Sequence, residues 1–452
     1  MLTILKRPEK FTPSGNNIIW QIESDNDNII YFKVELFDNE TSSLIFLSNF
    51  GIKPEIPKGT VIDLSRILSN VVNWEVNNDS LKLITPIYKT IRGYRLKITE
   101  RIVNTTSGLE EDGSVYNNLS DVNYVFNAKL GRIAANNFIQ VKYVINSASV
   151  SSFLTNKPNH SKANNISAEN LYFMQDGTVA GLRARIRTFD GSGSVIETET
   201  QLIPSIGQYK MYRINCSPKA LMDSCNLHFN NVAYYVVDII DGLANPRTEE
   251  RVYLYEQTKC HLDYVNLMWV NALGGIDSYQ FVAPQDSINV SRFTMKRNTS
   301  GINDDGIYSD LNNGVYHPSD VIIDNDVTTV TKVTSQEIND KEAYWFAELF
   351  YSKQLFVELP DTTLVPALLN NTSYSIPRLK YNRGNINTIS IDFTMAQGII
   401  PAGVQAYSTR TSSIEFIDSQ MNSLVNNLPG YDITSNTDTN NYSDDDYTQS
   451  YN

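Results

Sequence analysis

The stretch IIWQIESDNDNIIYFKVEL, residues 18–36, sets the structural character of the chain. Apolar side chains occupy alternate positions, at Trp20 and Ile22 before the polar turn DNDN and at Phe32 and Val34 after it. A period of two puts one face of a strand against a core and leaves the other in solvent. The stretch therefore predicts two half-buried antiparallel strands joined by a turn.

The same alternation recurs along the rest of the chain. It predicts a mainly β fold of several β-sandwich-like domains with a few short helices. A length of 452 residues is enough for several separate cores. Breaks in composition predict five parts: an N-terminal β-sandwich domain at 1–104, a linker at 105–122, a central β domain at 123–299, a β domain with one helix at 300–396, and a C-terminal extension contacting neighbours at 397–452.

Two segments change to a helical period. Leu64 and Leu68 fall on one side of a short predicted helix that Asp63 can cap. A second helix is expected between 335 and 351, with Ser335 as its cap.

The net charge limits the kinds of partner that the chain can bind. The formal net charge of −13 argues against a protein that grips nucleic acid through its phosphates, because such binding needs clustered Lys and Arg. A lumen through which DNA passes without being held is compatible with this charge. No run approaches the roughly 20 apolar residues of a membrane span. We therefore expect no membrane segment and synthesis in the cytoplasm.

The sequence lacks the usual signatures of catalysis and of metal binding. The histidines His160, His228, His261 and His317 do not lie in a metal-ligand spacing, and neither a GxSxG elbow nor a phosphate-binding glycine loop occurs. The cysteines form no CxxC pair. Adjacent acids are typical of solvated loops. The sequence thus predicts no enzyme activity, no cofactor and no metal.

Two charged clusters are candidate interfaces. Arg183, Arg185 and Arg187 alternate along a predicted strand, where they would solubilise or protect an exposed edge or form salt bridges between subunits. The polar C-terminal tail contains a second cluster, Asp444, Asp445 and Asp446. Ordering about twenty such residues costs tens of kcal/mol, at about 1 to 2 kcal/mol each, so an ordered tail would need neighbouring subunits.

The most distinctive stretch is CHLDYVNLMWVNALGGIDSYQF, residues 260–281. A double glycine between two aromatic strands implies a tight reversal or a close backbone approach, and Asp277 is placed to accept hydrogen bonds from turn amides. We expect a hairpin packed in a core. Its motif residues are Trp269, Asn271, Gly274, Gly275, Asp277, Tyr279 and Phe281.

Residues 267–281 resemble the LxFLNxLGGxDxFxF-like turn of a family of structural proteins of tailed phages and prophages of Bacteroidales, including crAss-like phages. The basic stretch 292–297 is similar to the strand that follows this turn in the family. The resemblance spans about residues 10–395, with Trp269 and Val270 where the family usually has Phe and Leu. It implies a virion protein of the tail, neck or portal-proximal rings without known catalysis.

These observations lead to one expectation and two rivals. We expect a ring-forming tail or neck component around the DNA channel, a cyclic homo-oligomer of sixfold or twelvefold symmetry that contacts other tail, neck or portal proteins. The first rival is a receptor-binding or fibre protein that recognises host surface glycans. The second is a tail-associated glycan hydrolase, which needs two carboxylates about 5 to 9.5 Å apart in a cleft.

Overall fold

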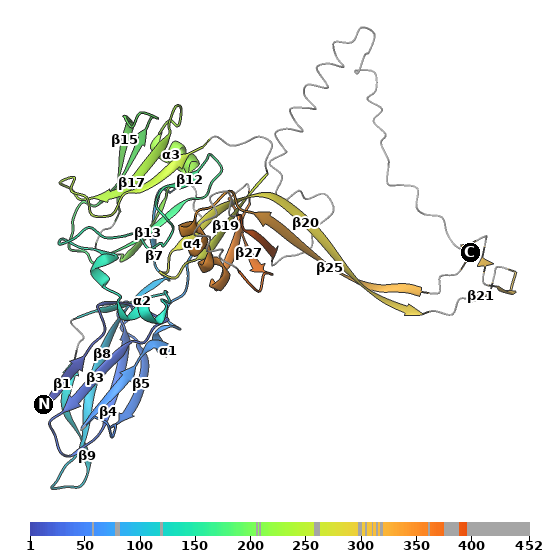
Figure 1. Cartoon of the computed structure of the whole chain (residues 1–452). Coiled ribbons are helices and arrows are strands. Elements are labelled where there is room, and N and C mark those ends of the chain that lie inside the picture. The colour runs from blue at the N-terminus through green and yellow to red at the C-terminus, as the bar shows by residue number, and fades with distance from the viewer. Residues whose placement is uncertain are drawn as a thin grey trace, which may run out of the picture. The chain divides into compact units, whose positions relative to one another are not determined.

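The computed structural model describes residues 1–56, 58–76, 82–117, 121–204, 207, 209–256, 263–296, 301–302, 305–309, 311–312, 315–316, 320–359, 362–374 and 388–395. Over these residues the chain is mainly β, as predicted, and its strands form two sandwiches and a closed barrel (Figure 1). The short helices are α1 (Ser65–Leu68), α2 (Arg132–Asn136), the 3-10 turn η1 (Gln140–Lys142), α3 (Pro218–Cys225) and α4 (Asp340–Tyr351).

The N-terminal sandwich packs two sheets face to face. The first sheet has the order β1 (Leu2–Lys6), β3 (Ile19–Ser24), β6 (Gly59–Asp63). The second has the order β2 (Phe11–Pro13), β10 (Asn123–Phe126), β8 (Ile91–Val103), β4 (Ile29–Asp38), β5 (Leu44–Gly51), and β9 (Glu110–Asn117) also pairs with β8. Trp20 and Ile22 from one sheet meet Val34, Leu36 and Leu96 from the other in a fully buried core.

Two sequence predictions for this region were wrong. The strands around the turn at 25–28 exist, but they lie in opposite sheets: β3 pairs with β1 and β6, whereas β4 pairs with β5 and β8. The segment 105–122 is not simply a linker, because β9 adds to β8 in antiparallel register. Its polar composition reflects a strand whose side chains are mostly exposed.

The central sandwich also has two sheets. One has the order β11 (Val144–Ile145), β13 (Asn170–Gln175), β16 (Met211–Asn215), β7 (Ile84–Ile87). The other has the order β12 (Ser161–Ala163), β18 (Arg251–Tyr255), β17 (Tyr234–Ile240), β14 (Arg183–Phe189), β15 (Val195–Leu202). Phe173 and Tyr212 of the first sheet pack with Ile186, Tyr235 and Val237 of the second.

The barrel closes in the order β19 (Tyr264–Val270), β20 (Ile276–Lys296), β25 (Asp320–Thr334), β28 (Ser390–Met395), β27 (Leu364–Leu369), β26 (Leu355–Glu358). Short hairpins β21 (Gly301–Ile302) with β22 (Tyr308–Ser309), and β23 (Leu311–Asn312) with β24 (Val315–Tyr316), lie between β20 and β25 in sequence. The predicted boundary at residue 300 therefore falls inside the connection between two barrel strands.

Helix α4 belongs to the barrel and begins later than predicted. Asn339, not Ser335, is its N-cap, and the Asn339 side chain accepts a hydrogen bond from the Glu342 amide while the Glu342 carboxylate accepts one from the Asn339 amide. This reciprocal capping box satisfies two backbone donors at the first turn. In α1, Asp63 does accept a hydrogen bond from the Ser65 amide, at 2.9 Å, although Leu64 is the N-cap residue.

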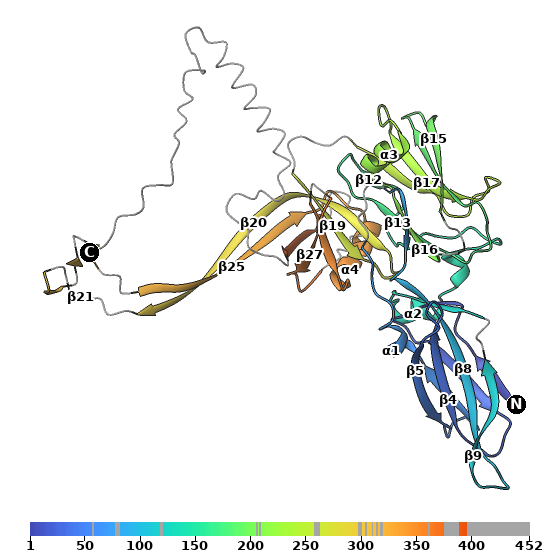
Figure 2. The same ribbon diagram turned by 180° about the vertical axis from the view of Figure 1, so that it is seen from behind.

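A shared apolar cluster joins the three parts. Phe11 and Phe126 of the N-terminal sandwich, Tyr172 of the central sandwich, and Met268 and Ile276 of the barrel belong to one buried cluster. Two strands also cross the predicted boundaries, since β7 joins the central sandwich and β10 joins the N-terminal one. Figure 2 gives the opposite view of these elements.

Candidate functional site

The hairpin at 267–281 is held by side-chain-to-backbone hydrogen bonds. β19 and β20 pair in antiparallel register from Val270 opposite Ile276 outward. In the turn, the Asn271 side-chain oxygen accepts hydrogen bonds from the amides of Leu273 and Gly275, each at 3.0 Å. Asn271, rather than the predicted Asp277, therefore serves the turn amides.

Both glycines of the turn permit close backbone contact. Gly274 has a φ of +87°, and a Cβ there would lie 2.6 Å from the Asn127 carbonyl oxygen. A Cβ at Gly275 would lie 2.6 Å from the Leu154 carbonyl oxygen. The double glycine thus lets the hairpin contact two other segments of the chain.

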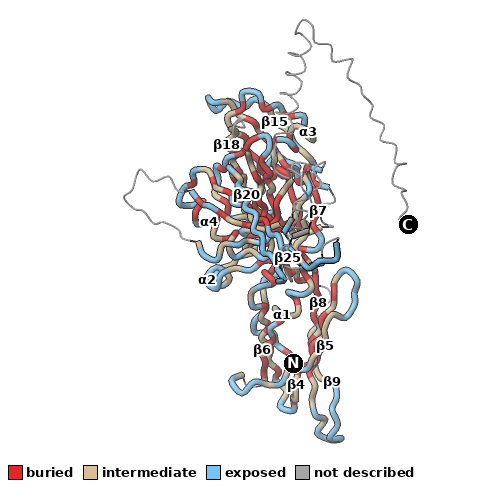
Figure 3. The backbone as a smooth tube through the Cα atoms, turned by 90° about the vertical axis from the view of Figure 1, so that its right-hand side faces the viewer, coloured by how far each residue is buried: buried red, intermediate tan, exposed pale blue. Residues whose placement is uncertain are grey.

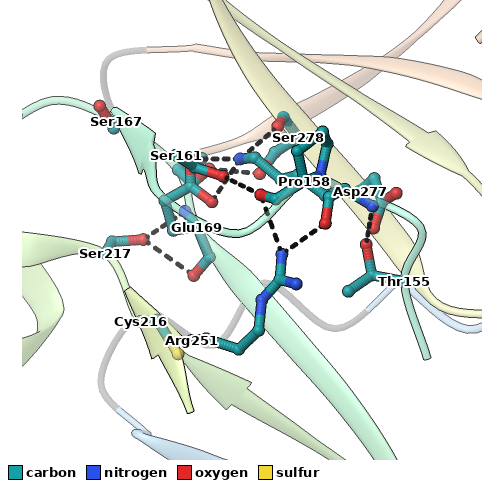
Figure 4. A network of polar contacts seen from close by, with 12 residues as sticks. Thr155, Pro158, Ser161, Ser167, Glu169, Cys216, Ser217, Arg251, Asp277 and Ser278 are labelled. Atoms are coloured by element: carbon teal, nitrogen blue, oxygen red, sulfur yellow. Dashed lines mark hydrogen bonds and ion pairs between the residues drawn. The ribbon is translucent and has the colours of Figure 1, made fainter. Parts of the chain in front are cut away.

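Asp277 is the centre of a buried polar network. Its carboxylate accepts hydrogen bonds from Trp345 Nε1 at 2.6 Å and from the Asn271 side-chain amide at 2.9 Å. Thr155 also bonds to it (Figure 4). Burial raises the pKa of Asp277, and these donors oppose the rise. One carboxylate therefore ties the barrel strand β20 to α4 and to the loop before β12.

A buried ion pair extends this network toward the central sandwich. Lys157 Nζ lies 2.7 and 2.6 Å from the two oxygens of Glu169 and 3.0 Å from the carbonyl oxygen of Ser278. Arg251 holds the same loop by donating to the Lys157 carbonyl at 2.7 Å (Figure 4). Burial raises the pKa of Glu169, and Lys157 opposes the rise. The pair is thus the main compensation for a carboxylate that is otherwise costly to bury.

Glu348 of α4 is a third buried acid. It accepts hydrogen bonds from the Asn156 side chain at 2.6 Å and from the Ala272 amide at 3.1 Å. Burial, together with the nearby Asp277 charge, raises the pKa of Glu348 to about 7. The helix is therefore bonded both to the glycine turn and to the loop beside it.

The aromatic motif residues fill the barrel next to this network. Trp269 is fully buried, and its ring centroid lies 4.9 Å from that of Trp345. Tyr279 lies edge-on to Phe346 at 4.7 Å and to Phe281 at 4.9 Å. Each such pair adds about 0.5 to 1.5 kcal/mol beyond simple burial.

The space beside the network is small. A cavity of about 30 Å³ is lined in part by Lys157, Glu169, Tyr279 and Trp345. It has room for roughly two water molecules, at about 10 to 15 Å³ each. We interpret these residues as the anchor of the hairpin rather than as a site that receives a substrate.

The strand that begins in this anchor ends in an exposed ribbon. β20 and β25 pair with each other as far as Lys296 opposite Asp320, well past the other barrel strands (Figure 1). The large apolar side chains of this ribbon are exposed to solvent, and Figure 3 shows that little of the ribbon is buried. The exposed apolar residues of β20 and β25 are Ile288 (63%), Val290 (45%), Phe293 (60%), Met295 (52%), Ile322 (49%), Ile323 (65%) and Val327 (38%).

The arginine stripe lies within a sheet and not on its edge. β14 runs between β15 and β17, so the edge-protection interpretation was wrong. Arg185 forms two hydrogen bonds to the buried Asp238, at 2.9 and 2.5 Å, and Arg187 pairs with Glu250 at 2.6 Å. Arg183 is exposed. A pairing between subunits is thus left mainly to Arg183.

Other predicted features can be placed only in part. Asp444, Asp445 and Asp446 lie outside the described residues. Among the described residues, no group of three or more His, Cys, Asp and Glu could hold a metal ion. Nor is any helix in that part of the chain long and apolar enough to cross a membrane.

The sequence did not show which residues meet in the buried network around Asp277. Glu348 was not predicted, because its partners Asn156 and Ala272 lie far away in sequence. Lys157 and Glu169 are only 12 residues apart, but no local pattern marks them as a buried pair. The ribbon did carry a signal: polar and apolar residues alternate over 287–291 without a proline or glycine.

Comparison with known proteins leaves the family open. No family model matches the chain, and neither does any curated protein. The class 5 fimbriae chaperone CfaA is 12% identical, over 57% of this chain and 99% of that one, with a TM-score of 0.18. A 1.5-MDa bacterial ice-binding adhesin is 10% identical, over 75% and 92%, also at 0.18. Dpr2 Ig1-Ig2, in complex with DIP-Theta, is 9% identical, over 57% and 99%, at 0.14. Scores this low support no argument about function.

Proposed function

We propose that this chain is a non-enzymatic structural subunit of a tailed-phage virion. It forms a ring in the tail or neck by assembling with copies of itself and with other tail, neck or portal proteins. The observation that carries the proposal is the exposed ribbon of β20 and β25. The resemblance of 267–281 to the phage family is the reason for placing this subunit in a tailed-phage virion.

The ribbon needs a partner for a physical reason. A two-stranded ribbon is at best marginally stable alone, because it has nothing to pack its apolar side chains against. Here Ile288, Phe293 and Ile323 each remain at least 60% exposed. Apolar side chains gathered on one projecting element are typical of an interaction surface. Covering them in an assembly supplies the burial that the single chain lacks.

The buried anchor supports the same proposal. Asp277 and Ser278, in the first residues of β20, are fixed by Trp345 and Lys157. A projecting arm can position a neighbouring subunit only if its base is rigid. The anchor provides that base without offering a cleft for substrate, and so favours a structural role over the glycan hydrolase.

The ring would surround the DNA channel. A net charge of −13 suits a lumen that repels phosphates. Closed cyclic symmetry also removes exposed sheet edges. A predominantly basic lumen would contradict this part of the proposal.

The first test is the position of the chain in purified virions. Mass spectrometry gives its stoichiometry, and symmetry-resolved electron microscopy gives its place. A sixfold or twelvefold ring on the portal axis is the expected result. Peripheral trimers would replace the proposal with the receptor-binding rival, and absence from particles would reject both.

A second test uses the purified full chain. The variant Ile288→Thr/Val290→Thr/Phe293→Thr keeps β-forming residues but removes the apolar surface of the ribbon. Light scattering should show assembly of the parent and not of this variant. The matched control is Val195→Thr/Ile196→Thr on β15, whose side chains are 54% and 41% exposed. Normal assembly of the ribbon variant would contradict the role of the ribbon.

A further inference from the structure

The outer half of the ribbon has two edges that pair with no other strand in the described part of the chain. β20 pairs with β19 only up to Val282, and β25 pairs with β28 only from Thr331 onward. Over 286–296, β20 pairs with β25 alone, along roughly 35 Å. Unpaired N–H and C=O groups on such edges are a template for another strand.

We infer that ribbons of neighbouring copies pair edge to edge, with β20 of one copy beside β25 of the next. The partner is thus a second copy of this chain, and the product is a continuous antiparallel sheet shared between subunits. The inference rests on the proposed self-assembly and specifies the contact that makes it.

The distribution of charge selects unlike edges. β20 carries the exposed Arg292, whereas β25 carries the exposed Asp324 and Asp326. Inside the ribbon, Arg292 lies opposite Asn325, and Asp326 lies opposite Ser291. Pairing β25 with a second β25 would bring together two strands that each carry Asp320, Asp324 and Asp326, and like charges directly across strands are destabilising. Pairing β20 with β25 of a neighbour instead brings Arg292 near acids.

Strand direction selects the same arrangement. If the ribbons of adjacent copies point the same way, β20 of one and β25 of the next run antiparallel, as β20 and β25 do within one ribbon. Contact between two like strands of such ribbons would be parallel. An unlike contact is also head-to-tail, so it repeats around a ring until the sheet closes. A contact between like edges would stop at a dimer.

The apolar side chains gain neighbours in this sheet. Val290 lies directly opposite Val327, so both point to one face, and Ile288 follows two residues away on that face. Lateral repetition aligns these residues into a continuous apolar stripe. Contacts between apolar side chains of neighbouring strands in that stripe favour the pairing.

Mixed cross-linking of single-cysteine variants tests which edges meet. Ser287→Cys, Asn289→Cys and Ser291→Cys on β20 are each mixed with a size-tagged Thr328→Cys on β25, and assemblies are oxidised. Three β20 positions are used so that different registers are sampled. Cross-links between unlike variants should exceed those between like variants about tenfold in at least one mixture.

The native cysteines should not interfere with cross-linking of the introduced ones. Cys216 and Cys225 are buried, and burial raises the pKa of both thiols, that of Cys225 to about 11. A thiol that stays protonated exchanges slowly. The parent chain, run in parallel, reports any cross-link through Cys260. Predominant links between like variants, or no links in assembled particles, would overturn the inference.

Charge reversal gives an independent test. Arg292→Asp alone and Asp326→Arg alone should each raise the concentration needed for assembly about tenfold, because unlike edges then carry like charges. The double variant Arg292→Asp/Asp326→Arg should restore assembly to about the parent level. Failure of the double variant to recover would count against paired unlike edges.

The outcomes separate this inference from the proposed function. Assembly into rings with no dependence on the ribbon would reject the pairing and leave the structural role intact. A full chain that is monomeric and absent from virions would reject the structural role itself. Binding of the ribbon to phosphatidylglycerol vesicles without self-assembly would reject the second-copy partner.

Discussion

The two halves of β20 have opposite surroundings although they form one continuous strand. In the first half, Asp277, Ser278 and Phe281 are buried and bonded or packed on both sides. In the second half, Ile288 and Phe293 are exposed, and among the described strands only β25 pairs with the backbone. The difference shows that β20 is packed and bonded by its own chain at the root (276–282), whereas at the tip (286–296) its apolar side chains stay exposed to solvent.

The largest effect should come from breaking the buried ion pair at the root. Lys157→Met leaves the carboxylate of Glu169 buried without its cation, which costs about 3 to 5 kcal/mol of unfolding free energy. Urea denaturation at pH 8 measures it. The control is Lys162→Met, which breaks an exposed pair with Glu256 and should cost about 0 to 1 kcal/mol. Equal losses in the two variants would contradict the contrast.

The next largest effect is a pH dependence of the unfolding free energy that comes from Glu348. Burial raises the pKa of Glu348 from its ordinary value of 4.5 to about 7, so the native state holds a proton that the unfolded state releases. The contribution of Glu348 to the unfolding free energy is therefore largest below about pH 4.5, and it falls by about 3 kcal/mol as the pH rises to 7.

The variant Glu348→Gln tests that source. It cannot titrate, so its unfolding free energy should lack this decline between pH 4.5 and 7. Chemical denaturation at several pH values, on the parent and the variant, gives both curves. Parallel curves would show that another group causes the pH dependence.

A somewhat smaller effect is expected from the glycine turn. Gly274→Ala places a Cβ against the Asn127 carbonyl oxygen at a φ of +87°, and such backbone strain costs about 1 to 3 kcal/mol. Thermal unfolding measures the loss. Gly191→Ala is the control, because a Cβ there meets nothing within 4 Å. An unchanged midpoint for Gly274→Ala would mean that the turn can relax.

The smallest effect on stability should come from the tip. Ile288→Thr/Phe293→Thr removes two exposed side chains, and surface changes of this kind stay within about 0.5 kcal/mol. The same variant should lose assembly. Urea denaturation below the assembly concentration measures stability, and a loss above about 1 kcal/mol would show that the tip stabilises its own subunit.

Local pattern was enough to predict many strands but not their partners. The alternation of Trp20, Ile22, Phe32 and Val34 follows from one buried face, which a sequence records directly. Whether β3 pairs with β4 depends on the course of the chain between sheets, which no local pattern records. Similarly, the strand containing Arg185 was predicted, whereas its acid partner Asp238 lies 53 residues away.

The errors at 105–122 and at α4 have different causes. β9 has few buried side chains, so its sequence is as polar as a loop. The start of α4 was readable, because Asn339 followed by Glu342 matches the capping-box spacing, and the choice of Ser335 overlooked it. The network around Asp277 could not be predicted, because Lys157, Glu169 and Trp345 converge from three separate segments.

The continuity of β20 and β25 from the barrel into the ribbon also has a mechanical consequence. Hydrogen bonds between antiparallel strands lie across the strand axis. A pull on the tip along the ribbon therefore loads the bonds to β19 and β28 in shear, so that many must break together, rather than peeling them one at a time. The ribbon can thus transmit tension to the barrel without its strands peeling away from β19 and β28 one hydrogen bond at a time.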